Sequence, residues 1–241
     1  MSPQQQQQSA LLAELAITVI EAALDAEMDE HLAGARFGIA QDGRRNSRNG
    51  TRPKTVRTVI GPVRIDVPRD RWGTFEPVTV GKWQREVVGI DRILLPLAAK
   101  DAPRSETLAL LTRAYPSNTP ERTLRRIADV TRERLAAWHE RRFEAQFPVL
   151  HVHMSTLRTD TGHPTGFPVL SIVGATAPDS EGNRRRELLS LYAVRPDRGA
   201  EPWQAVVSDL KRRELSGVRS VVGAASAPFR AAVAGTWQIA N

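Results

Sequence analysis

The sequence predicts an α+β protein in which a helical N-terminal region with one β-hairpin is followed by an α/β domain. Three observations support this fold class. Apolar residues recur at helical spacing near the N-terminus, two β-rich runs flank Gly61-Pro62, and three more β-rich runs precede a helix after residue 146. The 241 residues exceed the common domain size of about 100–150 residues, so we expect several domains. The expected divisions are 1–33, 34–87, 88–145 and 146–241.

An amphipathic helix is predicted between Ala10 and Leu32. Four apolar residues recur at spacings of three and four and share one helical face: Ile17, Ile20, Leu24 and Met28. Another face is acidic, at Glu21, Asp25 and Asp29. Residues 3–9 are mostly glutamine and offer nothing to bury, so we expect a polar tail without fixed structure. The helix is interpreted as core packing within the chain, with a surface for a partner chain as the alternative.

A β-hairpin is predicted from two runs of strand-forming residues, Thr55–Ile60 and Val63–Val67, separated by Gly61-Pro62. We expect Pro68 to end the second strand, because proline cannot donate a hydrogen bond to a neighbouring strand. The charged residues that follow would then form a loop.

The hairpin region also carries most of the positive charge. The chain has a formal net charge of +7 and a pI near 10.6, and from Gln41 to Arg71 nine basic residues stand against three acidic ones. Such a concentration indicates an anionic partner, or else a solvated basic loop. Arginine pairs bidentately with phosphate, which favours DNA as the partner. Asn46, Asn49 and Trp72 add amide and aromatic groups of the kind used near bases.

Composition and motifs do not support several other classes of protein or of functional site. The chain has no cysteine, which excludes disulfides and thiolate metal sites, and it has no apolar run near the roughly 20 residues of a membrane helix. We find no Gly-rich nucleotide loop and no Gly-x-Ser-x-Gly elbow. No signal peptide is recognised, so we expect a cytoplasmic protein without a membrane partner.

Residues 88–141 are predicted to be helical. Ser105 can cap a helix that ends near Ala114, residues 115–118 form a break, and Thr119-Pro120-Glu121 begins the next helix. The apolar stripe of that helix comprises Leu124, Ile127, Ala128, Leu135 and Trp138. Two interpretations stay open. The pair is either a helix-turn-helix that presents Arg122, Arg125 and Arg126 to a DNA groove, or an ordinary helical hairpin with solvated arginines.

Beyond Phe147 the order of elements changes to strand, strand, strand, helix, strand, helix. The expected elements are strands at Val149–Leu157, Phe167–Ala175 and Glu187–Val194, a helix from Pro202 to about Glu214, a buried strand at Val218–Val222, and a helix from Pro228. An RNase H-like domain begins in this order, although several α+β folds share it.

Several short segments, in their shared order, resemble the Mutator-type transposases of bacterial insertion sequences. The first segment is Glu27–Leu32, and the second is Asn46–Gly50 together with Lys54–Val56. The third consists of Gly61, Val67–Arg71, Gly73 and Phe75–Pro77, and the fourth of Trp203 and Asp209–Lys211. The resemblance implies an RNase H-like domain in which three carboxylates hold two Mg²⁺ ions for strand cleavage and transfer. It also implies that the partner is double-stranded DNA at element ends.

At the positions where the resemblance implies catalytic acids, this sequence has other residues. The first position falls on His153 and the second on Ala224, and we expect the third beyond Asn241, so we predict an incomplete RNase H-like domain without catalytic or metal-binding residues. Mg²⁺ is expected for intact family members and no cofactor for this chain. His151 and His153 could form a His-x-His metal pair, although a solvent-facing pair is the simpler interpretation. Asp160 and Asp209 are interpreted as non-catalytic.

DNA binding is therefore the biochemical property that we expect this chain to retain. The predicted DNA-binding residues are Arg44, Arg45, Arg48, Asn49, Arg52, Lys54, Arg57, Arg69, Arg71, Arg122, Arg125 and Arg126. We expect a nucleoid-associated protein that forms homo-oligomers or mixed oligomers with an intact transposase. Two alternatives stay open: a non-catalytic DNA-binding protein that inhibits transposition, and a decayed reading frame whose product barely folds.

Overall fold

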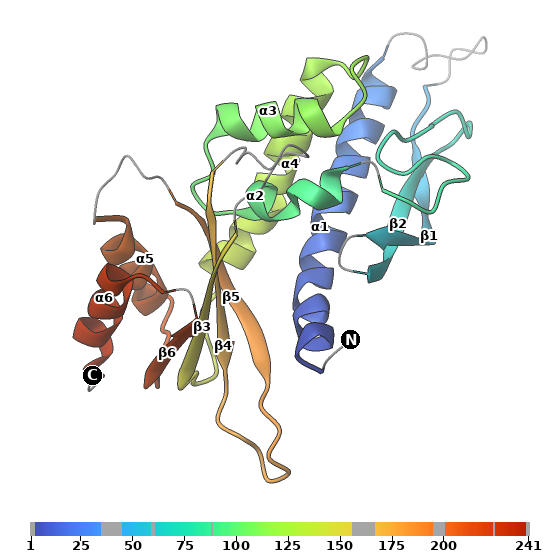
Figure 1. Cartoon of the computed structure of the whole chain (residues 1–241). Coiled ribbons are helices and arrows are strands. Elements are labelled where there is room, and N and C mark those ends of the chain that lie inside the picture. The colour runs from blue at the N-terminus through green and yellow to red at the C-terminus, as the bar shows by residue number, and fades with distance from the viewer. Residues whose placement is uncertain are drawn as a thin grey trace. The chain divides into compact units, whose positions relative to one another are not determined.

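The computed structural model describes residues 3–34, 45–58, 61–87, 89–155, 167–194, 201–223 and 225–239 (Figure 1). The chain divides into two compact units. The first comprises residues 1–98 and 104–135, and the second comprises residues 99–103 and 136–241. Helices and antiparallel strands occur in both, which agrees with the α+β class. No helix among these residues is long and apolar enough to cross a membrane.

The first unit is built around helix α1, Pro3–Ala33. The expectation of an unstructured tail is wrong, because the helix begins at Pro3; glutamine is a good helix former and extends a helix at little cost. The predicted apolar face is buried at Ile20, Leu24 and Met28, whereas Asp25 and Asp29 of the acidic face are only half-buried. The buried face is wider than expected, because Leu15, Val19, Ala23 and Ala26 are buried as well. It packs against the hairpin and against the short helix α2 (Leu94–Ala98), which supports the interpretation of core packing within the chain.

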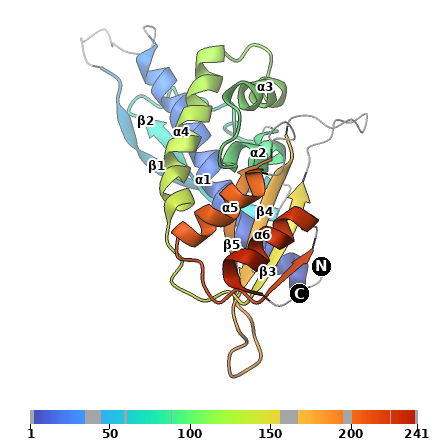
Figure 2. The same ribbon diagram turned by 90° about the vertical axis from the view of Figure 1, so that its left-hand side faces the viewer.

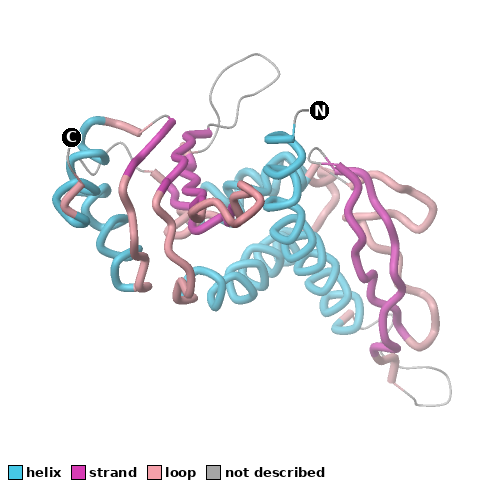
Figure 3. The backbone as a smooth tube through the Cα atoms, turned by 90° about the horizontal axis from the view of Figure 1, so that it is seen from below, coloured by secondary structure: helices cyan, strands magenta, loops and turns pink. Residues whose placement is uncertain are grey.

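The predicted hairpin is confirmed, with longer strands than expected. Strand β1 runs from Arg48 to Thr58 and pairs antiparallel with β2, Gly61–Asp70. The prediction that Pro68 ends the second strand is wrong, because β2 continues through it. Each strand of a two-stranded sheet has an open edge, and a proline is tolerated where its nitrogen faces that edge. The hairpin lies alongside the helices in Figure 3, and β2 packs on α1 with Val63 and Ile65 buried.

The helical part of the first unit contains η1 (Ile90–Ile93), α2, α3 (Arg104–Ala114) and the beginning of α4 (Glu121–Glu140). The predicted break after Ala114 and the start at Glu121 are confirmed. Of the predicted stripe, all members are buried except Trp138, which is half-buried.

The second unit contains a four-stranded sheet in the order β5-β4-β3-β6. Its strands are β3 (Val149–Ser155), β4 (Val169–Ala175), β5 (Arg186–Ala193) and β6 (Ser220–Gly223). The first three are antiparallel neighbours, whereas β6 pairs parallel with β3. The predicted order of elements is confirmed, but the expectation of a buried last strand is wrong. Strand β6 forms an edge of the described sheet, and Val222 is 39% exposed.

Helices α5 (Glu201–Arg212) and α6 (Ala227–Trp237) lie on one face of this sheet (Figure 2). Leu150 and Val152 of β3 face a core shared with Leu210 of α5 and Phe229 of α6. Alternation along β3 therefore places His151 and His153 on the opposite face.

Candidate nucleic-acid interface

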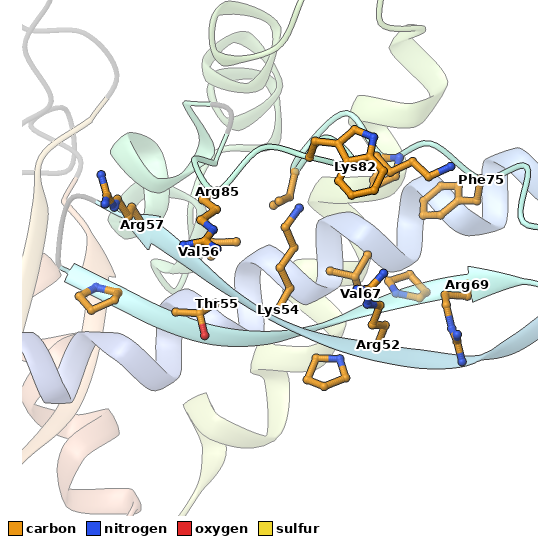
Figure 4. Close-up of a pocket in the computed structure, with 16 residues that line it drawn as sticks. Arg52, Lys54, Thr55, Val56, Arg57, Val67, Arg69, Phe75, Lys82 and Arg85 are labelled. Atoms are coloured by element: carbon orange, nitrogen blue, oxygen red, sulfur yellow. The ribbon is translucent and has the colours of Figure 1, made fainter.

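The hairpin and the segment that follows it enclose a groove of about 660 Å³ (Figure 4). We call residues 71–87 the wrapping segment, because this part of the chain turns back along β1. The backbone N–H of Arg57 donates to the carbonyl oxygen of Arg85 at 2.7 Å, and the ammonium of Lys54 donates to the carbonyl oxygen of Gly81 at 2.8 Å. Burial lowers the pKa of Lys54, and the nearby Arg52 lowers it further.

The side chains that line this basic groove include cations from both walls. They are Arg52, Lys54, Arg57 and Arg69 from the hairpin, and Lys82 and Arg85 from the wrapping segment. No carboxylate belongs to the lining. Among the described residues, no carboxylate lies within ion-pair distance of any of these six cations. Two aromatic residues also line the groove, the half-buried Phe75 and Trp83, which is 88% exposed.

Asp70, at the end of β2, fixes the start of the wrapping segment. Its carboxylate is buried and accepts hydrogen bonds from Asn46 Nδ2, from Thr74 N and Oγ1, and from Phe75 N. Burial opposes ionisation, but these four donors outweigh it and hold the pKa of Asp70 well below its usual range. Asn46 is therefore a buried structural residue, and the expectation that it lies near bases is wrong.

Glu27 of α1 fixes the middle of the same segment. Its carboxylate is buried and accepts hydrogen bonds from Val78 N, Thr79 N and Thr79 Oγ1. The hydroxyl of Thr79 also contacts the Tyr115 hydroxyl at 2.6 Å. Burial raises the pKa of Glu27, and the hydrogen bonds offset this only in part. Two buried acids, one on the helix and one on the hairpin, thus fix the wall that carries Lys82 and Arg85.

A second group of predicted DNA-binding arginines lies against α1 instead of in the groove. Arg48 of β1 donates to Asp25 Oδ1 and to Asp29 Oδ1, at 2.5 and 2.7 Å, and Arg126 of α4 lies 3.1 Å from Asp29 Oδ2. Arg122 pairs with Glu30. Burial opposes ionisation of Asp29, but the arginine hydrogen bonds outweigh it and lower its pKa.

The structure thus divides the predicted site. Arg48, Arg122 and Arg126 are neutralised by the acidic face of α1, and Arg125 pairs with Glu121 one turn earlier in α4. These pairs support the helical-hairpin interpretation for this face.

Three other predicted residues do not belong to the groove lining. Arg45, Asn49 and Arg71 are exposed, and Arg44 lies outside the described residues. Sequence reasoning missed Lys82, Trp83 and Arg85. The signal that could have found them was the pair of cations flanking an aromatic residue in Lys82-Trp83-Gln84-Arg85.

In the second unit, the position of the first expected acid is on strand β3. His153 is exposed, and the neighbouring Val152 pairs with Gly223 at the end of β6. Partial burial lowers the pKa of His151, and the charge of Arg186 lowers it further. Ala224 and Asp160 lie outside the described residues.

The described part of this unit does not fit a Mg²⁺ site. Nowhere in the described ranges do three or more histidine, aspartate or glutamate side chains gather as a metal-binding group. Mg²⁺ prefers carboxylate oxygens, whereas the side chain at His153 is an imidazole.

Asp209 of α5 belongs to a network of hydrogen bonds and ion pairs. Its carboxylate accepts from Lys100 Nζ at 2.9 Å and from the Tyr192 hydroxyl at 2.6 Å, and it also pairs with Arg212. Burial opposes ionisation of Asp209, but these donors outweigh it and lower its pKa. Lys100 and Arg212 in turn bind Glu140. This arrangement supports the non-catalytic interpretation of Asp209.

Comparison with known proteins matches residues 2–241 to the family described as "Transposase, Mutator family". Similar proteins include the transposase for insertion sequence element ISRM3 of Rhizobium meliloti (strain 1021), which is 28% identical over 204 residues, covering 84% of this chain and 49% of the relative. The transposase for insertion sequence element ISRM5 of the same organism is 30% identical over 225 residues, covering 92% and 54%. The transposase for insertion sequence element IS905 of Lactococcus lactis subsp. lactis (strain IL1403) is 24% identical over 205 residues, covering 85% and 51%. The chain spans about half the length of these relatives.

Proposed function

Because this chain belongs to the Mutator family of transposases, we propose that it binds double-stranded DNA at insertion-element ends through the basic groove of its first unit. The observation that carries the proposal is the acid-free lining of six cations. Cations without a carboxylate partner keep their full charge, so they can pair with phosphates and release the counterions condensed on DNA. The arginines held by the α1 acids contribute less, since their charge is already compensated.

The proposal is tested by DNA binding over a salt series. Three exposed groove arginines, Arg52, Arg57 and Arg85, are replaced together by alanine. If each contacts one phosphate, the slope of log K against log salt becomes shallower by about 2.7, at about 0.9 per contact. A slope equal to that of the unsubstituted chain would show that these groove arginines do not contact DNA.

A control variant loses the same charge outside the groove. Arg92, Arg113 and Arg219 are exposed and do not line it. Their joint replacement by alanine is expected to leave the slope nearly unchanged. Equal effects of both triple variants would mean that total charge, and not the groove, determines binding.

The second unit is proposed to be the beginning of an RNase H-like domain. Its support is the strand order β5-β4-β3-β6, with three antiparallel neighbours and a parallel β6 that follows helix α5. An experimental structure of the chain, compared with RNase H-like domains, tests this assignment; a different connection of the strands would contradict it.

We further propose that this polypeptide does not itself cleave or join DNA, because the position of the first family acid carries His153. This observation favours the second candidate function, a non-catalytic DNA-binding protein that occupies element ends and can inhibit an intact transposase in mixed oligomers. The purified chain is incubated with element-end DNA and Mg²⁺. Metal-dependent strand cleavage would overturn the proposal, whereas protection of the ends without cleavage would support it.

A further inference from the structure

Trp83 is much more exposed to solvent than the other tryptophans of the described residues. It is 88% exposed, whereas Trp72, Trp138, Trp203 and Trp237 are all half-buried. An exposed indole presents a flat apolar face to water, and nucleic-acid bases stack on such faces. Trp83 also lines the basic groove, so its ring lies beside cations.

We propose that the basic groove binds an unpaired DNA strand, with a base stacked on Trp83 and the flanking phosphates paired with the groove cations. This inference rests on the proposed function: the duplex of an element end contacts the cations on the rims of the groove, and an unpaired strand of the same DNA enters between them. Exposed aromatic side chains in a positively charged groove are the chemistry by which single strands are bound, because every base has a face that can stack. The bases of an intact duplex are stacked on one another and are not available to the indole.

The size of the groove fits this occupant. Its volume of about 660 Å³ lies within the range of about 300–1,000 Å³ that holds small molecules. That is the scale of a few nucleotide groups, and it cannot enclose a double helix. A duplex can contact only the rims, whereas a single strand can enter.

The cations are arranged along both walls of the groove. In Figure 4, Arg52 and Arg69 lie on the strands of the hairpin, and Lys82 and Arg85 lie on the wrapping segment opposite. A phosphate backbone that follows the groove therefore meets a cation on either side. Lys54 reaches between the walls to the Gly81 carbonyl and keeps them together.

The test measures binding of three labelled probes by fluorescence anisotropy. The probes are an oligo-dT strand of about 15 nucleotides, the same strand with abasic sites at its centre, and a duplex of the same length. The proteins are the unsubstituted chain, Trp83→Ala, Trp83→Phe, and Gln84→Ala as the control, since Gln84 is exposed in the wrapping segment but lies outside the groove lining.

We expect Trp83→Ala to weaken oligo-dT binding on the order of 10-fold. Trp83→Phe, which keeps an aromatic face, should lose less. Gln84→Ala should bind as the unsubstituted chain does, and duplex affinity should change by less than about two-fold in all variants. Removal of the central bases should weaken binding by the unsubstituted chain but not by Trp83→Ala, because base and indole act as one stacked pair.

Other outcomes overturn the inference in distinguishable ways. If Trp83→Ala leaves oligo-dT binding unchanged, or if removing the bases weakens both proteins equally, no base stacks on Trp83. If the chain binds duplex but not oligo-dT, the single-strand inference fails while the proposed function stands. If neither probe is bound, both fail.

Discussion

The buried carboxylate of Asp70 offers a strong test of how the groove is held together. Replacing it with asparagine preserves the shape but leaves one acceptor oxygen and adds two donors. Asp70 accepts four hydrogen bonds, three of them on Oδ2. With the amide oxygen of Asp70→Asn at the position of Oδ2, the Phe75 N–H loses its acceptor and faces an NH2 group, and the three bonds on Oδ2 lose their charged acceptor. Each unsatisfied buried group costs about 1–3 kcal/mol. We expect a loss of about 3 kcal/mol and, with it, a Tm lower by about 10 °C.

The measurement is urea and thermal unfolding followed by circular dichroism. Asp66→Asn is the matched control, because Asp66 is an exposed aspartate on the same strand. The pKa of Asp70 is lower in the folded than in the unfolded state, so its stabilisation is fully present above about pH 4 and is lost as the pH falls below that value. Two results would refute this reasoning. One is a loss of unfolding free energy below about 1 kcal/mol in Asp70→Asn. The other is a difference in unfolding free energy between Asp70→Asn and the unsubstituted chain that does not become smaller in acid.

Three further substitutions test other parts of the structure. Burial raises the pKa of Glu27, so the unfolding free energy of the unsubstituted chain should fall as the pH rises above about 4.5. Glu27→Gln removes this carboxyl, and the fall should be smaller in the variant. Urea titrations that give both proteins the same pH profile would contradict this. Arg213→Met leaves the carbonyls of Arg141 and Leu189 without the buried guanidinium donor, and calorimetry should show a stability loss of about 3 kcal/mol with DNA binding retained. Gly174→Ala would place a Cβ 2.5 Å from the Phe147 ring, and we expect a loss of about 1–3 kcal/mol in chemical denaturation; near-neutral behaviour would show that the ring can move aside.

Local sequence signals were sufficient for much of the secondary structure. The break after Ala114 and the start of α4 at Glu121 follow from capping residues and a proline that act within one turn. The strands of the second unit follow from runs of β-rich residues. Family membership also follows from sequence, since short motifs in a shared order do not depend on geometry.

Sequence reasoning failed where contacts between distant segments decide the outcome. The sequence indicated an acidic face on α1 but not its partners, and Asp29 of that face binds Arg48 of the hairpin and Arg126 of α4. Asp70 looked like one surface charge in a basic stretch, yet it is a buried acceptor that fixes the wrapping segment.

The sequence by itself determined how much positive charge the hairpin region carries, and that this charge lies in a Mutator-family chain. Only the tertiary structure decided which cations remain available, because an ion pair depends on distance in space. Arg126 and Asp29 are 97 residues apart in sequence and still meet. The wrapping segment similarly brings Trp83 and Arg85 against β1, which makes a groove from residues that no spacing rule connects.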